Sequence, residues 1–207
     1  MIAAILLAAA QTASPVTTAI DAERAFAADA QKLGQWTAFR KWATADAIMF
    51  VPRPGSAHEF LEGKADPPVA VFWWPGRSYV SCDGKTAINT GPWVRQWGKS
   101  VGYFTTVWQR QPDGSWKWTL DHGDALQTAR AEGGDIKPQQ AACPTLPLPP
   151  GPQREVPTEV KFGGGSSKDG TLRWDWTILP DGSRTFLASI WDGKQHRVVI
   201  DDRVKAE

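Results

Sequence analysis

The most constraining feature of this sequence is a long stretch, residues 78 to 124, in which apolar and polar residues alternate with a period of two. Alternation of this kind places successive side chains on opposite faces of a β-strand. Two turn signals interrupt it, Asp83-Gly84 and the tetrapeptide Pro-Asp-Gly-Ser at positions 112 to 115. Because Asp-Gly supplies the positive φ angles of a tight turn, the stretch predicts two consecutive antiparallel hairpins.

Helical patterns precede these strands. Thr18 and Asp21 form a capping box before a pattern in which apolar residues recur at steps of three and four, and Gly34 is placed to end this helix. Two shorter helices are expected, at about residues 36 to 43 and 56 to 63. Helices gathered before a run of strands predict an α+β fold, in which the N-terminal helices cover one face of a curved antiparallel sheet.

The last third of the chain has a different character. Residues 127 to 157 are rich in proline and polar residues, which is typical of an extended connector. Residues 158 to 207 predict a small β-meander of three strands, and the glycine-rich segment 161 to 170 is interpreted as a flexible loop. Since three short strands are marginally stable alone, we expect the meander to dock on the first domain or on another chain.

The N-terminus predicts export. Residues 2 to 10 form a short apolar run that ends in small residues, so residues 1 to 13 are interpreted as a signal peptide; the alternative is an apolar N-terminus on a cytosolic protein. The only two cysteines, Cys82 and Cys143, would form a disulfide in an oxidising compartment; the alternative is two separate thiols. The expected location is therefore periplasmic or secreted.

Composition argues against several classes of function. The formal net charge is +1 and the charges are scattered, so nucleic acid is not an expected partner. No segment after the N-terminal run is long and apolar enough to span a membrane. We find no nucleotide-binding fingerprint and no zinc or iron spacing, so no cofactor and no metal is expected. The twelve tryptophans fit a large β-rich core or, alternatively, stacking surfaces for a flat ligand.

Several segments together resemble a known family. They are DAERAFAADAQKLG with ADAIMF, then GPWV, and finally GYFTTVWQRQPDGSWKWTLDHGD, whose hairpin is the most specific part. Residues 18 to 126 thereby resemble the SnoaL-like branch of the nuclear transport factor 2-like superfamily, in particular its exported members of unassigned function. The resemblance implies a cone of curved antiparallel sheet, closed by three helices around a pocket. Superfamily members include isomerases, dehydratases, cyclases and non-catalytic binders, so the fold does not determine the chemistry.

The candidate for chemistry is His122. Strict alternation in the last strand places His122 on the core-facing side with Trp118, and Asp121 on the opposite side. Asp124 shares the parity of His122, and a carboxylate beside an imidazole raises the pKa of the ring and orients it as a general base. The alternative is an inward histidine that bonds a backbone carbonyl or a buried acid and takes no part in catalysis.

Other residues are expected to line the pocket. Tyr103 and Trp108 lie on opposite faces of one strand, and the sequence does not fix which face lines the cone. Asn89 and Trp93 share parity in the neighbouring strand, and Trp118 belongs to the core-facing set.

Three hypotheses of function follow. The first is an exported protein that binds a small apolar or aromatic molecule in the cone without turning it over. The second is a cofactor-free isomerase or lyase in which His122 is the base and Asp124 orients it. The third is an interaction module, in which the C-terminal meander completes a homodimer or caps the cone.

Overall fold

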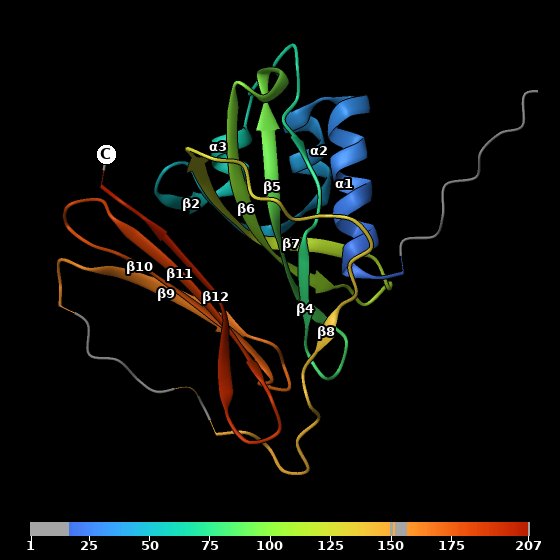
Figure 1. The fold of residues 1–207 in the computed structure, drawn as a ribbon, viewed down its shortest axis with the longest axis vertical. Helices are drawn as coiled ribbons and strands as arrows, with labels where there is room; N and C mark the ends of the chain where they lie inside the picture. Colours follow the sequence, from blue (N-terminus) through green and yellow to red (C-terminus); the bar gives the residue numbers. More distant parts are fainter. Residues whose placement is uncertain (1–16, 150, 152–156, 207) are drawn as a thin grey trace, which may run out of the picture.

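The computed structural model describes residues 17–149, 151 and 157–206. Figure 1 shows an α+β cone formed by the first part of the chain and a C-terminal sheet that lies against it. The predicted α+β fold, with N-terminal helices on one face of a curved sheet, is confirmed. The predicted signal peptide, residues 1 to 13, lies outside the described residues.

The cone contains three helices and most of the strands. In chain order its elements are α1 (Ala19–Leu33), α2 (Gln35–Trp42), β1 (Ala43–Phe50), β2 (Pro54–Ser56), α3 (Ala57–Leu61), β3 (Phe72–Trp73), β4 (Arg77–Val80), β5 (Thr86–Arg95), a 3-10 turn η1 (Gln96–Gly98), β6 (Ser100–Arg110) and β7 (Trp116–Leu126). The connector then contributes β8 (Gln139–Gln140), and the C-terminal sheet consists of β9 (Lys161–Ser166), β10 (Leu172–Ile178), β11 (Arg184–Trp191) and β12 (His196–Val204).

The first helix begins and ends where its sequence predicts. The Thr18 hydroxyl accepts a hydrogen bond from the Asp21 backbone N–H at 3.1 Å, and the Asp21 carboxylate accepts one from the Thr18 N–H at 3.1 Å, which completes the capping box. Gly34, at φ +108°, separates α1 from α2. A Cβ at Gly34 would lie 2.3 Å from the Asp66 carboxylate, so this turn requires glycine.

The cone sheet has eight strands in the order β2-β1-β7-β6-β5-β4-β8, with β3 paired to β5. Most neighbours are antiparallel, but β1 pairs with β7, and β4 with β8, in parallel. We call the face that carries the helices the inner face. Its core is built from apolar residues of α1 and α2 and from large aromatic residues of the strands, among them Phe26, Phe39, Trp73, Trp108 and Trp118.

The opposite, outer face of the cone sheet is covered by the C-terminal sheet. Ile88, Val107 and Leu120 of the cone share one hydrophobic core with Leu172 and Phe186 of the C-terminal sheet. The predicted meander therefore docks on its own chain. Cys82 and Cys143 form a disulfide with a Cα–Cα distance of 5.1 Å, which ties the connector to the turn between β4 and β5.

The C-terminal sheet has four strands, in the order β12-β11-β10-β9, rather than the three predicted. The additional strand is β9, whose glycines were expected to form a flexible loop. A Cβ at Gly163 would lie 2.4 Å from the Trp176 ring, and one at Gly165 would lie 2.6 Å from the Trp174 ring. The glycines thus allow tryptophan rings of β10 to lie across the edge strand, which sequence periodicity does not reveal.

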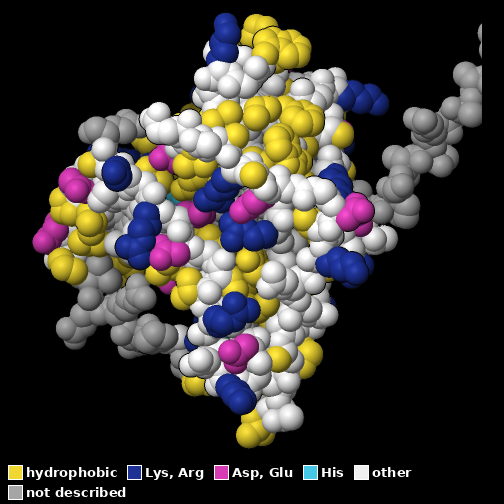
Figure 2. All heavy atoms as spheres, in the orientation of Figure 1, with side chains coloured by type: hydrophobic (Ala, Val, Ile, Leu, Met, Phe, Trp, Pro, Cys, Tyr) yellow, Lys and Arg dark blue, Asp and Glu magenta, His cyan; other side chains and the backbone are white. Residues whose placement is uncertain are grey.

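The surface of the molecule carries charges of both signs. On the face shown in Figure 2, Lys and Arg side chains are interspersed with Asp and Glu, and hydrophobic side chains gather toward the upper end. None of the helices in the described ranges is long and apolar enough to cross a membrane. Within the same ranges, no three His, Cys, Asp or Glu side chains come together as a possible metal site.

Candidate functional site

A β-bulge in β7 determines which side chains reach the inside of the cone. Val107 of β6 pairs with Leu120, whereas the next residue, Trp108, pairs with Trp118. Thr119 is therefore the extra residue between these two pairs. An insertion of one residue into a strand reverses the in-and-out alternation beyond it.

This reversal changes the orientation predicted for the end of β7. Trp118, before the bulge, packs in the inner core. Leu120, after it, packs against the C-terminal sheet. Asp121 consequently faces the inside of the cone, and His122 faces the C-terminal sheet. The prediction that His122 shares a face with Trp118 is wrong, because it assumed an uninterrupted strand.

A cavity of about 280 Å³ opens between the helices and the end of β7. Its walls are mainly aromatic and come from α1, α2 and the strands of the inner face: Phe26, Trp36, Phe39, Trp73, Trp93 and Phe104. The pairing of β1 with β7 ends at Met49 and Asp121, so the cavity passes the end of β1 and reaches both faces of β7. Asp121 lines it from the inner face and His122 from the outer face.

Two of the five predicted lining residues, Trp93 and Tyr103, border this cavity. The other three, Asn89, Trp108 and Trp118, do not; all are fully buried. The first two turn toward α1 and donate hydrogen bonds there. The Trp118 ring packs edge-on against Phe39 at 6.0 Å between centroids and so lies behind the wall instead of in it.

A buried carboxyl group, that of Glu23 on α1, organises the core beside the cavity. The indole N–H groups of Trp73 and Trp108 donate to its two oxygens at 2.8 Å and 2.7 Å, and the Asn89 amide donates at 3.3 Å. We call these four residues the Glu23 cluster. Burial raises the pKa of Glu23 to about 7 against these hydrogen bonds, and the nearby Asp121 contributes in the same direction. Glu23 itself does not line the cavity.

Asp121 is the second carboxyl of the inner face. The Thr106 hydroxyl donates to Asp121 Oδ2 at 2.8 Å, and this is the only hydrogen bond its carboxylate accepts from the described residues. The residue lies deep in the protein and yet keeps some accessible surface, because it borders the cavity. Burial raises the pKa of Asp121 to about 7. A carboxyl with this pKa in an aromatic cavity can both donate and accept a proton near neutral pH.

His122 has the opposite electrostatic setting. It is 1% exposed and stacks on Phe186 at 5.4 Å between ring centroids, with Phe50 edge-on at 5.0 Å. Burial lowers the pKa of His122 to about 3, and the positive charges of Arg184 and Arg130 act in the same direction. The imidazole is therefore neutral at pH 7.

The predicted partnership of His122 with Asp124 is absent. Neither ring nitrogen of His122 has a hydrogen-bond partner among the described residues. Asp124 instead lies 3.8 Å from Arg184, the first residue of β11. The expectation that a carboxylate raises the pKa of His122 is thus contradicted, because β11 brings an arginine to this carboxylate and an apolar wall to the ring.

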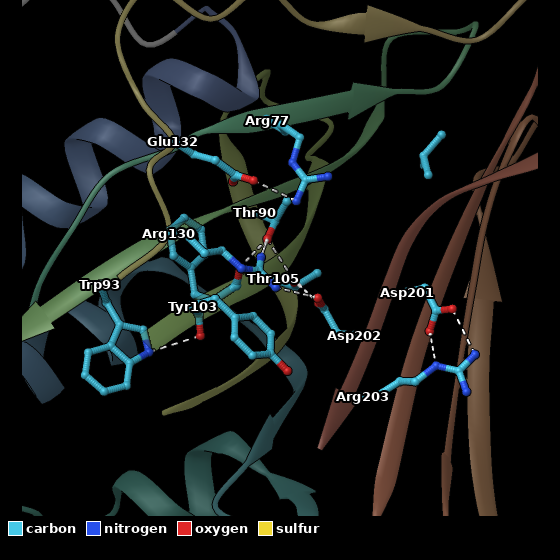
Figure 3. Close-up of polar contacts among 12 residues, drawn as sticks. Arg77, Thr90, Trp93, Tyr103, Thr105, Arg130, Glu132, Asp201, Asp202 and Arg203 are labelled. Carbon is cyan, nitrogen blue, oxygen red and sulfur yellow. Dashed lines mark hydrogen bonds and ion pairs between the residues drawn. The ribbon is translucent and has the colours of Figure 1, made fainter. Parts of the chain in front are cut away.

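A polar network joins the two sheets next to this point (Figure 3). Arg130 donates to Asp202 at 3.0 Å, and the Thr105 hydroxyl donates to the same carboxylate at 2.7 Å. The Arg130 guanidinium lies over the Tyr103 ring, 4.1 Å from its centroid. Trp93 donates to the backbone oxygen of Tyr103 at 3.0 Å. The network holds the outer face of β6 and the C-terminal strand together at the cavity.

Three residues of the site were not predicted from the sequence. Glu23 carried a signal, since it lies within the apolar stripe of α1, between Ala22 and Phe26. Strict alternation places Asp121 on the wrong face, because the sequence does not reveal the bulge at Thr119. Arg184 stands at the start of a strand in the C-terminal sheet, and nothing in its local sequence links it to the cone.

Comparisons with known proteins find partial structural similarity at low sequence identity. No family model and no curated protein matches the chain. Among solved structures, a candidate ketosteroid isomerase from Shewanella frigidimarina matches at 21% identity, covering 53% of this chain and 97% of that one, with a TM-score of 0.39. A candidate ketosteroid isomerase from Parabacteroides distasonis matches at 18% identity, covering 52% and 88%, with a TM-score of 0.41. A protein of unknown function from Pectobacterium atrosepticum matches at 10% identity, covering 51% and 87%, with a TM-score of 0.38.

The architecture described above is the one that the sequence resemblance implies for residues 18 to 126. Three helices close the inner face of a curved, mostly antiparallel sheet around a cavity. The helices, the curved sheet and the cavity that the resemblance implies are thus present in this part of the chain.

Proposed function

We propose that the cone binds a small apolar or aromatic molecule. The observation that carries the proposal is the aromatic-walled cavity of about 280 Å³. Ligand sites are typically concave and apolar, with a few polar groups that fix orientation, and this cavity is at the small end of their usual range. Phe26, Phe39 and Trp73 supply the apolar wall, and Asp121 supplies one of the polar groups. A molecule of the size of naphthalene suits this space.

Calorimetric titration with 2-naphthalenemethanol, a neutral aromatic alcohol, tests this proposal. The wild-type protein should bind it, and Val71→Phe should weaken binding at least about tenfold, because Val71 lines the cavity and the larger ring fills it. Val69→Phe is the matched control, since Val69 is 59% exposed and lies outside the cavity. Absence of binding by the wild type, or equal binding by both variants, would contradict the proposal.

A second candidate is a cofactor-free proton-transfer enzyme of the isomerase or lyase type, with Asp121 in place of His122 as the base. The raised pKa of Asp121, about 7, and its place on the cavity wall favour it. The carboxylate would take a proton from a carbon next to a carbonyl group and return it. Because the ionised form is the base, the rate should rise as pH increases through about 7.

Hydrogen–deuterium exchange at the acidic carbon of 2-tetralone, followed by NMR in D₂O, tests this second candidate. The wild-type protein should accelerate exchange, Asp121→Asn should abolish the acceleration, and Asp124→Asn should retain it. Asp124 is a suitable control because it borders the same cavity from the outer face. Acceleration that survives Asp121→Asn would exclude Asp121 as the base.

We also propose that the protein acts outside the cytoplasm. The disulfide between Cys82 and Cys143 supports this, because such bonds persist in oxidising compartments. The full chain expressed in a bacterium should appear in the periplasmic fraction with its N-terminal segment removed and no free thiol. Recovery of an uncleaved, reduced chain from the cytoplasm would contradict the proposal.

A further inference from the structure

The outer-face end of the cavity contains polar groups without partners. The hydroxyl of Tyr103, both ring nitrogens of His122 and Nε of Arg184 are buried and make no hydrogen bond with the described residues. The three residues are 3%, 1% and 8% exposed, and all three line the cavity. We call them the rim site. Buried polar groups in native proteins are nearly always hydrogen-bonded, so a cluster of unpaired ones needs an explanation.

The neighbouring polar groups are already engaged and do not supply partners. Arg184 uses another guanidinium nitrogen to donate to the Gly123 carbonyl at 3.1 Å. Asp202 accepts from Thr105 and Arg130. Figure 3 shows no hydrogen bond to the hydroxyl of Tyr103. The network that joins the two sheets thus contacts Tyr103 through its ring and its backbone oxygen, but forms no hydrogen bond with its hydroxyl.

Each residue of the rim site offers a hydrogen-bond donor. The phenol O–H, the arginine Nε–H and the one N–H of a neutral imidazole are all donors. Of the two carboxylates nearest to them, that of Asp202 already accepts from Thr105 and Arg130, and that of Asp124 lies 3.8 Å from Arg184 and is 36% exposed. A group of donors that includes a buried arginine suits a negatively charged acceptor. Among such acceptors, a carboxylate matches the planar geometry of the guanidinium.

We propose that the ligand of the cone is an aromatic or alicyclic carboxylic acid whose carboxylate binds Tyr103, His122 and Arg184 while its ring occupies the aromatic part of the cavity. This inference rests on the proposed binding function and specifies its ligand class. It also accounts for the position of the rim site on the outer face of β7, since the cavity passes the end of β1 and links the two faces.

Calorimetric titration with two matched probes tests the inference. 2-Naphthoate carries the carboxylate, whereas 2-naphthalenemethanol has the same ring system and a neutral hydroxymethyl group. Wild-type protein should bind naphthoate at least about tenfold more tightly, because hydrogen bonds to a charged acceptor are stronger than neutral ones. Equal affinity for the two probes, or preference for the alcohol, would overturn the inference and leave the binding function intact. If the protein bound neither probe, the proposed binding function would be overturned, and this inference with it.

A variant assigns the effect to the rim site. Tyr103→Phe removes a hydroxyl that has no partner in the described protein, so it should preserve the fold and reduce naphthoate affinity about tenfold, with little change for the alcohol. Tyr79→Phe is the matched control: its hydroxyl donates to Val199 between the same two sheets, outside the cavity, and naphthoate binding should not change. Unchanged naphthoate binding in Tyr103→Phe would mean that the rim site holds a bound water only, and would overturn the proposal.

Discussion

The Glu23 cluster contains a fully buried carboxyl group and the cavity a half-buried one, that of Asp121. Glu23 receives three hydrogen bonds from side chains and is sealed from the cavity. Asp121 receives one and borders the cavity. Burial raises the pKa of both to about 7. A raised pKa alone therefore does not identify a functional acid in this protein; accessibility to a ligand distinguishes the two groups.

The largest expected effect is on the free energy of unfolding, and it concerns the structural role of Glu23. Glu23→Ala leaves two buried indole N–H groups without their acceptor, removes one of the two hydrogen bonds of the Asn89 amide, and creates a cavity. We expect a loss of about 3 kcal/mol or more in the free energy of unfolding, measured by urea denaturation. Arg24→Ala, at an exposed position on the same helix, should change it by less than about 0.5 kcal/mol. Similar small effects for both variants would show that Glu23 is not a structural group.

The next effect concerns the pH dependence of stability contributed by Asp121. Its pKa rises from 3.8 to about 7 on folding, so the folded state binds more protons between these values and loses stability as pH increases through this window. Asp121→Asn removes this loss. Relative to wild type, the variant should gain on the order of 2 kcal/mol between about pH 4 and pH 7, a figure reduced for the access of water to the cavity. A flat difference between the two denaturation series would contradict the raised pKa.

His122 should give a difference of the opposite sign. Its pKa falls from 6.5 to about 3 on folding, so the unfolded state binds more protons between these values and the wild type gains stability as pH increases through them. His122→Phe lacks this gain and should lose stability relative to wild type as pH rises from about 3 to 6.5. Urea denaturation of Asp121→Asn and His122→Phe over a series of pH values tests both pKa shifts. If the stability difference from wild type changed in the same direction with pH for both variants, one of the two pKa shifts would be wrong.

The smallest effect concerns the one hydrogen bond to Asp121. Thr106→Val keeps the shape of the side chain and removes the hydroxyl that donates at 2.8 Å. Stability should fall by about 1 kcal/mol at pH 8, where Asp121 is ionised, and by less at pH 5. Thr119→Val is the control, since the Thr119 hydroxyl makes only a long contact of 3.4 Å to Val107. An equal loss of stability for both variants at both pH values would show that the Thr106 hydroxyl does not stabilise the ionised form of Asp121.

The fold could be predicted from the sequence to the extent that local patterns determine it. The capping box of Thr18 and Asp21 marks the start of α1, and the Asp-Gly turns set the strand boundaries of the long hairpins. These signals lie within a few residues of the structures they specify. The fourth strand of the C-terminal sheet was missed because its glycines are explained only by tryptophan rings on β10.

The candidate site could be predicted only in part, for a different reason. Residues 118 to 124 contain the right groups, but the bulge at Thr119 exchanges the faces of Asp121 and His122. A bulge depends on pairing between strands and leaves no mark in the alternation of one strand. Arg184 comes from the C-terminal sheet, and only tertiary packing brings it to Asp124.

The central claim is that Asp121, and not Glu23, is the carboxyl that a ligand reaches. NMR titration of the two side-chain carboxyl carbons, with and without 2-naphthalenemethanol, tests it directly. We predict that both carbons titrate near pH 7 in the free protein, and that the ligand shifts the Asp121 resonance strongly and the Glu23 resonance only weakly. An Asp121 carboxyl that titrates near its ordinary value of about 4, or that is unaffected by bound ligand, would contradict the account.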